Sequence, residues 1–310
     1  MRLKFTYIIF YLLGMIQFVN AQTNDKSLKF DKTIDSLGQI VLENTNAKSR
    51  DSATTEIITL WKDNLVDSNS FHHLMTTVKT ISVLYPSDSS FRIITGQHFI
   101  NDNEYRYYGG IQLANGKFIP LHDKSYEIRA AQEDNVLLDK DNWYGALYYK
   151  MFDCQLDSSK YYLLLGFNGF SFYNKRKVIE VLSFDKNQEP IFGKEVFVAD
   201  TGEVEDYDLR KLYMYSADVS QKLNYDPTLG FIVLDHLMPS KEIFPGQGPT
   251  FVPDGSLEGY KYLNGKWQHL NVLEQKAMDD IMVAPKVQDN NAQLKYDEHY
   301  KATRKRKRRH

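Results

Sequence analysis

Two adjacent residues, Asp235 and His236 in FIVLDHLMP, bring together a carboxylate and an imidazole, the groups used most often in general acid–base catalysis. Neighbouring side chains on a strand point to opposite faces, so we expect one of the two to face the interior and the other solvent. The chain has no G-x-S-x-G elbow and no S-x-x-K motif with its companion motifs. Because catalytic triads are recognised by geometry, a hydrolase acting on envelope or extracellular polymers stays open as an alternative function.

Metal binding is the second chemistry to consider, because the chain has eight histidines. His72 and His73 are adjacent on a predicted helix and point about 100° apart, so they cannot chelate one ion as residues four apart do. Neither H-E-x-x-H nor C-x-x-C occurs. The densest acidic group, in VADTGEVEDYDL, lacks the spacing of an EF-hand loop, and we interpret it as a solvated turn. We therefore expect no metal site and no cofactor.

Aromatic side chains are the third candidate, because tyrosine occurs 21 times and often in pairs. Exposed rings can stack on sugars or peptides, although strands are enriched in aromatic residues for structural reasons as well. Two segments, 107–111 and 143–147, share the order aromatic, Tyr, Gly, small, aliphatic, which indicates either a repeated sheet unit or glycines that admit neighbouring rings. The candidate ligand-binding residues are Tyr108, Trp143, Tyr144, Asp235 and His236.

The single cysteine, Cys154, lies among apolar neighbours in YYKMFDCQL and can form no disulfide within the chain. We expect a buried, inert thiol, so that stability must come from the hydrophobic core.

Both ends of the chain are basic, and the region between them is acidic. Residues 1–21 combine a positive start, a short apolar stretch and the ending Val-Asn-Ala, which predicts a signal peptide cleaved near Gln22. The stretch is too short to span a bilayer, so no integral membrane segment is expected after cleavage. Residues 22–300 carry 29 basic and 40 acidic side chains, a net charge of −11, which disfavours nucleic acid as a partner of the folded body. The basic run Arg304–His310 predicts a disordered tail over 285–310 that can reach an anionic envelope component.

Residues 22–85 read as a helical segment, because apolar residues recur at helical spacing over three stretches separated by capping side chains. From Phe91 onward the period changes to that of strands. Asn115-Gly116 is the strongest hairpin signal, and Asn264-Gly265 marks another turn. The strands predicted over 86–284 are FRIITGQHF, EYRYYGGIQL, KFIPL, NWYGALYYKMF, KYYLLLGF, KVIEVLSF, KEVFVA, RKLYMYSA, GFIVLDHL, SLEGYKYL and KWQHL.

These strands are too closely spaced for crossover helices, so their pairing should be antiparallel. The predicted fold is α+β, with a short helical N-terminal segment followed by a predominantly antiparallel β assembly that is a sandwich, a barrel or a partial propeller.

The segments KYYLLLGFNGFSFYNKRKVIEVLSFDKNQEPIFGKEVF, LNYDPTLGFIVLDHLMP and FVPDGSLEGYKYLNGKWQ resemble a group of uncharacterised exported proteins from Bacteroidetes-type bacteria. The resemblance spans roughly residues 85–270 and implies a periplasmic or cell-surface location. It transfers no activity and no site residue. Together with the signal peptide, it leads us to expect an exported, non-catalytic binding or scaffolding protein.

Overall fold

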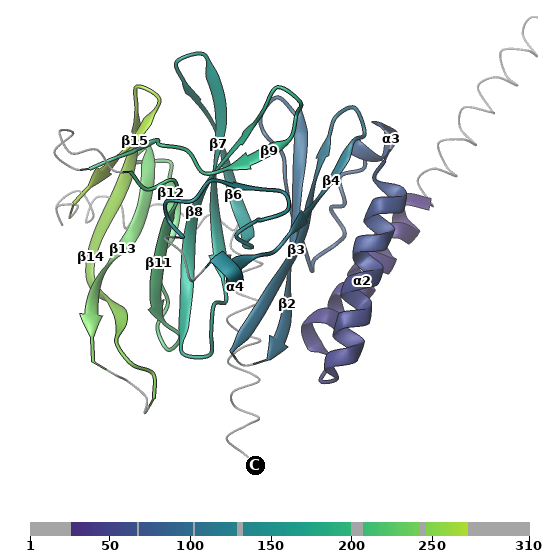
Figure 1. Cartoon of the computed structure of the whole chain (residues 1–310), viewed down its shortest axis with the longest axis horizontal. Coiled ribbons are helices and arrows are strands. Elements are labelled where there is room, and N and C mark those ends of the chain that lie inside the picture. Colours follow the sequence, from purple (N-terminus) through teal and green to yellow (C-terminus); the bar gives the residue numbers. More distant parts are fainter. Residues whose placement is uncertain are drawn as a thin grey trace, which may run out of the picture.

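The computed structural model describes residues 26–66, 68–101, 103–128, 133–199, 207–241 and 246–271. In this part of the chain, three mostly antiparallel sheets form most of the structure, and a few helices accompany them (Figure 1). The predicted signal peptide, the basic tail and residues 200–206 of the acidic group lie outside the described residues.

Two long helices lie against the first sheet: residues 26–43 and α2 (Ala47–Asn64). The side chain of Asn46 caps α2 by accepting a hydrogen bond from the backbone N–H of Ser49 at 3.3 Å. Both helices bury apolar residues at helical spacing, including Ile34, Val41, Ile57 and Trp61, in one core cluster. None of the helices in the described part of the chain is both long and apolar enough to cross a membrane.

The third stretch with helical spacing, from Phe71 to Ile81, is not a helix. The structure has only the single turn α3 (Ser68–Phe71) at its start. The polypeptide after it is tied to helix 26–43 through Asp31, whose carboxylate contacts His73 Nε2 and accepts a bond from Thr77 Oγ1, both at 2.6 Å. Arg92 donates to the backbone carbonyls of Ser70 and His73. These hydrogen bonds to distant residues hold the segment in place of the i to i−4 hydrogen bonds of a helix. The apolar side chains of residues 71–81 are therefore buried although the segment is not helical.

The first sheet has the order β1 (Ser82–Leu84), β2 (Phe91–Asn101), β3 (Glu104–Leu113), β4 (Phe118–His122). The predicted hairpin at Asn115-Gly116 joins β3 to β4, and Gly116 has the positive φ, +93°, that such a turn requires. The one-turn helix α4 (Ser125–Ile128) follows the sheet.

The middle sheet has the order β5 (Leu138–Asp139), β9 (Pro190–Phe192), β8 (Asn174–Phe184), β7 (Ser159–Asn168), β6 (Leu147–Leu156), and β11 (Lys211–Ser216) also pairs with β8. The strand predicted over NWYGALYYKMF begins only at Leu147. Gly145 has φ +75°, and a Cβ there would lie 2.5 Å from the Asp123 carboxylate, so the preceding residues form a loop. Segments 107–111 and 143–147 therefore differ in structure and are not repeated sheet units.

The outer sheet has the order β10 (Phe197–Val198), β15 (Lys266–Leu270), β14 (Thr250–Leu263), β13 (Phe231–Ser240), β12 (Leu223–Asp226). All its pairs are antiparallel except β10 with β15. At the turn from β14 to β15, Asn264 and Gly265 both have positive φ, as the sequence pattern predicts.

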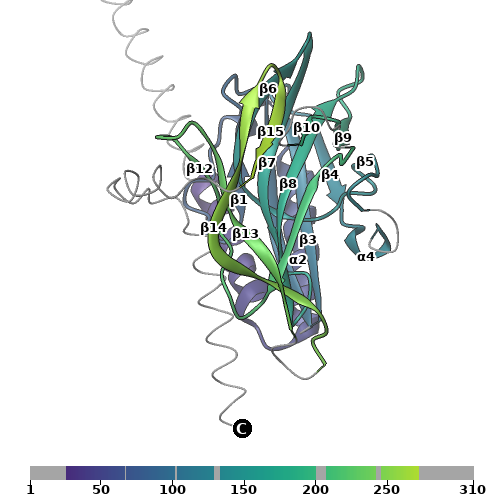
Figure 2. The same cartoon turned by 90° about the vertical axis from the view of Figure 1, so that its left-hand side faces the viewer.

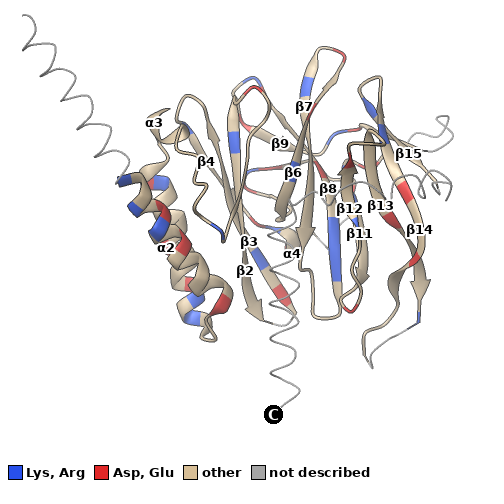
Figure 3. Ribbon diagram, turned by 180° about the vertical axis from the view of Figure 1, so that it is seen from behind, with Lys and Arg blue, Asp and Glu red and all other residues tan. Residues whose placement is uncertain are grey.

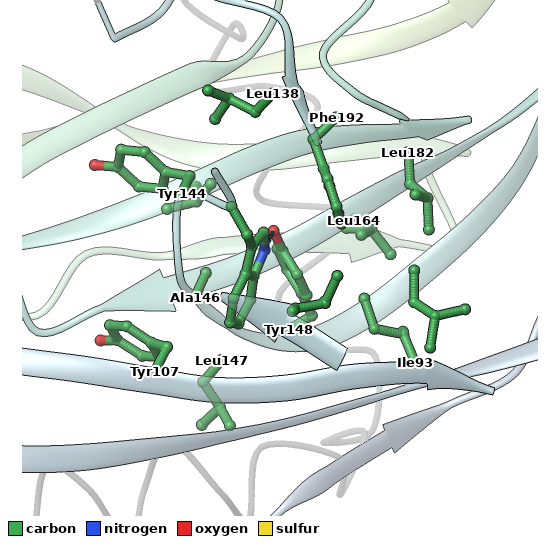
Figure 4. Close-up of a cluster of buried hydrophobic side chains, with 14 of the residues drawn as sticks. Ile93, Tyr107, Leu138, Tyr144, Ala146, Leu147, Tyr148, Leu164, Leu182 and Phe192 are labelled. Carbon is green, nitrogen blue, oxygen red and sulfur yellow. Dashed lines mark hydrogen bonds between the residues drawn. The ribbon is translucent and has the colours of Figure 1, made fainter. Parts of the chain in front are cut away.

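The elements stack as four layers in the order helices, first sheet, middle sheet, outer sheet (Figures 1 and 2). Alternate residues of each inner strand enter different cores: Ile94 faces the helices, whereas Ile93 faces the middle sheet. Figure 4 shows the core between the first and middle sheets, where Ile93 lies on the same side as Leu164 and Leu182, and Tyr107 lies on the side of Ala146 and Leu147. Each of the three sheets ends in edge strands in the described residues, so none closes on itself as the barrel alternative would require.

Candidate binding surface on the outer sheet

The three aromatic residues that the sequence nominates for ligand binding are buried. Tyr108 is 3 % exposed and lies between the first sheet and the helices, with its ring centroid 5.6 Å from that of Trp61. Burial raises the pKa of its phenol. Trp143 and Tyr144 lie in the core between the first and middle sheets: Trp143 Nε1 donates to the Tyr148 hydroxyl at 3.0 Å, and the Tyr144 hydroxyl accepts from Arg176 at 2.6 Å.

The five nominated residues therefore do not converge on one site. Asp235 and His236 lie on β13 of the outer sheet, apart from the cores that hold the three rings. Each buried ring has structural contacts that explain its presence, which agrees with the packing interpretation of the aromatic residues.

A buried charged network that the sequence does not predict begins at Arg176, the partner of Tyr144. Arg176 pairs with Glu133 at 2.7 Å and lies 3.8 Å from the centroid of the Phe170 ring. Deeper in the core, Arg210 pairs with Glu180 at 2.9 Å, and both side chains are fully buried. Arg210 also donates to the backbone carbonyls of Glu133 and Phe192. The network thus ties the loop at Glu133 and the start of β11 to the middle sheet.

Electrostatics within this network follow from burial. Desolvation raises the pKa of Glu180 against the opposing effect of Arg210. Desolvation, with the nearby charges of Asp208 and Glu133, raises the pKa of Asp134 to about 6. Shifted pKa values can mark active sites, but ion-pair networks inside a protein shift them too. Since Glu180 and Arg210 are out of reach of solvent, we interpret this network as structural.

One sequence signal could have indicated the network. Glu180 lies inside the predicted apolar strand KVIEVLSF, and Arg176 directly precedes it. Both residues belong to β8 and, being four positions apart, share one face of that strand. A charged residue inside a strand with two apolar faces indicates a buried partner of opposite charge.

His236 does have an acidic partner, but it is Asp254 and not the adjacent Asp235. His236 Nδ1 lies 2.9 Å from Asp254 Oδ2, while the other oxygen of Asp254 accepts bonds from the hydroxyl and backbone N–H of Ser256. The bonds from Ser256, followed by that with His236, lower the pKa of Asp254 to about 2. The carboxylate lies between the hydroxyl and the imidazole, whereas in a serine triad the imidazole takes that central place.

Asp235 has a structural contact of its own. Its carboxylate accepts a hydrogen bond from the backbone N–H of Lys222 at 2.6 Å, which extends the pairing of β12 and β13. Burial is the largest influence on this carboxyl and raises its pKa.

A bulge separates two parts of the β13–β14 hairpin. Asp235 pairs with Leu257, but the next pair is Leu237 with Pro253, so three residues of β14 bulge opposite His236. We call the part beyond this bulge the distal arm; it comprises Leu237–Ser240 of β13 and Thr250–Pro253 of β14.

The distal arm is apolar and partly exposed. Its two strands, LMPS and TFVP, contain no charged residue, and Figure 3 shows them without acidic or basic colouring. Met238 is 46 % exposed, Pro239 is exposed, and Phe251 and Val252 are half-buried. Apolar surface of this kind, bordered by polar groups such as His236 and Asp254, is typical of a contact site for another molecule.

The end of the distal arm away from the bulge is fixed to the middle sheet. Thr250 Oγ1 donates to Asn174 Oδ1 at 2.7 Å, and Gln247 Nε2 donates to the carbonyl of Tyr173 at 3.2 Å. Pro239 and Pro253 lack an N–H, so neither strand of the arm offers a full row of donors to an added strand. A partner would therefore contact the arm through side chains.

The part of the chain that the structure describes contains no group of three or more His, Cys, Asp or Glu side chains arranged to hold a metal ion. Comparison of the chain with protein-family models, with curated proteins and with solved structures finds no match.

Proposed function

We propose that the protein is an exported, non-catalytic module of the periplasm or cell surface, and that it binds apolar side chains of a polypeptide partner through the distal arm. The observation that carries the proposal is the apolar, partly exposed arm, whose end away from the bulge is anchored to the middle sheet. Methionine adapts its shape to different partners, and the prolines restrict strand addition, so side-chain packing is the mode of contact that this surface supports.

Export, and the division of the mature chain into an N-terminal segment, 22–85, that contains the helices and a β-rich domain, 86–284, are parts of the same proposal. The support for export is the N-terminal sequence. Mass spectrometry of the native protein should find an N-terminus at or near Gln22, and an intact Met1 on the cell-associated protein would contradict export with cleavage.

The binding proposal is tested with a peptide library and a glycan array, probed with the wild type and two variants. Met238→Asp places a charge on the distal arm, and Leu74→Asp places one on an exposed apolar residue elsewhere as a matched control. We expect the wild type and Leu74→Asp to bind a common set of apolar peptides, and Met238→Asp to bind them at least tenfold more weakly.

Two results would contradict the binding proposal. Peptide binding that is equal in all three proteins would place the contact elsewhere. Hydrolysis of an ester, glycoside or peptide substrate that is lost in His236→Ala would favour the hydrolase alternative instead.

The basic run Arg304–His310 supports a second contact, with an anionic envelope component such as lipopolysaccharide or an acidic glycan. Each basic residue near an anionic surface contributes up to about 1 kcal/mol, screened over roughly 8 Å at physiological salt. Deletion of residues 301–310 should abolish salt-sensitive association with anionic vesicles and leave the melting temperature unchanged. Equal association of full-length and truncated protein at low salt would rule this contact out.

A further inference from the structure

The polar groups that border the distal arm lie on one of its two faces. His236 and Met238 are two residues apart on β13, so their side chains share a face, and Val252 joins them as the register partner of Met238. The carboxylate of Asp254 lies on this face too, because it contacts the imidazole of His236 at 2.9 Å. One face of the arm thus combines apolar side chains with a carboxylate.

This face becomes accessible at the bulge. Before the bulge, the same face of β13 carries Ile232 and Leu234, which are fully buried in the core shared with the middle sheet. From the bulge onward the burial ends: the side chain of His236 is 39 % exposed, Met238 is 46 % exposed, and the side chain of Asp254 is 28 % exposed. A partner in solution can therefore reach the apolar side chains and the carboxylate together.

The carboxylate of Asp254 is held in place with room for one more donor. Its Oδ1 accepts bonds from the hydroxyl and the backbone N–H of Ser256, and its Oδ2 contacts His236. A carboxylate has about four acceptor positions, so these three contacts leave one of them on Oδ2. The bonds from Ser256, followed by that with His236, lower the pKa of Asp254 to about 2, so the group is ionised at neutral pH. Because the carboxylate is already fixed, binding a cation costs little further ordering.

We propose that the polypeptide segment bound by the distal arm carries a basic side chain next to its apolar residues, and that Asp254 binds this side chain. The inference rests on the proposed function and adds a charge preference to it. Two residues of a strand span about 7 Å, so the spacing from Met238 to His236 and its partner Asp254 fits an extended segment whose basic residue lies two positions from the apolar residue on Met238. An acidic residue at that position would be repelled by Asp254, which adds discrimination between partners.

The test compares three end-blocked peptides, acetyl-Leu-Val-Phe-Ser-Xaa-Gly-amide with Lys, Gln or Glu at Xaa, by calorimetry with the full chain. The Lys peptide should bind about fivefold more tightly than the Gln peptide at low salt, the Glu peptide should bind more weakly than either, and the differences should shrink at about 0.5 M salt. Asp254→Asn should bind the Lys and Gln peptides equally. Glu56→Gln, which neutralises an exposed carboxylate on α2, is the matched control and should keep the preference for Lys.

The possible failures of the inference and of the proposed function are distinguishable. Equal binding of the Lys and Gln peptides by the wild type, with both lost in Met238→Asp, would overturn the charge preference and leave the proposed function in place. A preference for Lys that persists in Asp254→Asn would overturn the inference as well, because it would then come from the overall negative charge of the protein. No binding of the Lys peptide at millimolar concentration would also overturn it, whereas the peptide library decides the proposed function separately.

Discussion

The fully buried pair Glu180–Arg210 allows a quantitative test of how the core tolerates charge. Glu180→Leu leaves the guanidinium of Arg210 without its counter-charge, and removal of one partner of a buried pair costs about 3–5 kcal/mol. Arg210→Met leaves the carboxyl group alone and also leaves the carbonyls of Glu133 and Phe192 without their donor. Since an unsatisfied buried carbonyl costs about 1–3 kcal/mol, Arg210→Met should be the more destabilising change at neutral pH.

The double variant Glu180→Leu with Arg210→Met removes both charges and retains only the cost of the two carbonyls. It should therefore be more stable than Arg210→Met alone, and the double-mutant cycle should give a coupling of about 3 kcal/mol or more. Urea unfolding at 25 °C measures all four proteins. The exposed pair Asp88–Lys160 supplies the control cycle, in which the coupling should stay within about 1 kcal/mol.

The pH dependence of Arg210→Met identifies the cause of its instability. Burial raises the pKa of Glu180, and loss of Arg210 removes the influence that opposes this rise. A carboxyl whose folded pKa exceeds its unfolded pKa binds more protons in the folded state, so it destabilises the protein increasingly as pH rises through that interval. Arg210→Met should thus recover stability, relative to the wild type, as pH falls from 8 toward about 4.3. Single variants that each cost under about 1 kcal/mol, or costs that add in the double variant, would refute this account.

Three further predictions concern single sites. Burial raises the pKa of Asp134 in the folded protein to about 6. Asp134→Asn should therefore stabilise the protein at pH 7.5 by about 1 kcal/mol, after allowance for partial exposure, and this gain should vanish as pH falls toward 4. Urea unfolding at both pH values measures the two free energies. Burial raises the pKa of Cys154 to about 11, so its thiol should resist labelling in the native protein and Cys154→Ser should cost about 1–2 kcal/mol, whereas rapid labelling would contradict the inert assignment. Leu234→Asp, on the inner face of β13, should abolish the cooperative melting transition, while Lys261→Asp, at an exposed position of β14, should leave it unchanged.

The sequence predicts the long strands well, because alternation and turn chemistry are local signals. EYRYYGGIQL and KWQHL coincide with β3 and β15, and the glycine turns at 115–116 and 264–265 lie where the pattern places them. The strand predicted over GFIVLDHL corresponds to β13, which lies between β12 and β14. Short strands such as β1, β5 and β9 escape prediction, since their pairing is decided by partners distant in the sequence.

The candidate residues were harder to place. Alternation of apolar residues along a strand identifies its two faces, but it does not show which element covers each face. Tyr108 is at an alternating position that could have faced solvent, and the helices cover it. Trp143 and Tyr144 lie between two sheets whose stacking no local pattern indicates. The distal arm was missed for a related reason: its apolar residues read as ordinary core strand, and only the bulge opposite His236 separates them from the core.

The parallel pairing of β10 with β15 has a consequence for the order of folding. Phe197 and Val198 align with Trp267 and Gln268, so this contact closes a loop of about 70 residues that contains β11 to β14. Closing so long a loop costs entropy that two strand residues cannot offset by themselves. The hairpins within the loop shorten the effective distance once they have formed, so β10 should join the outer sheet last. Until then, the edge of β15 is open to pairing with other chains, which exposes the nascent outer sheet to misassembly during folding.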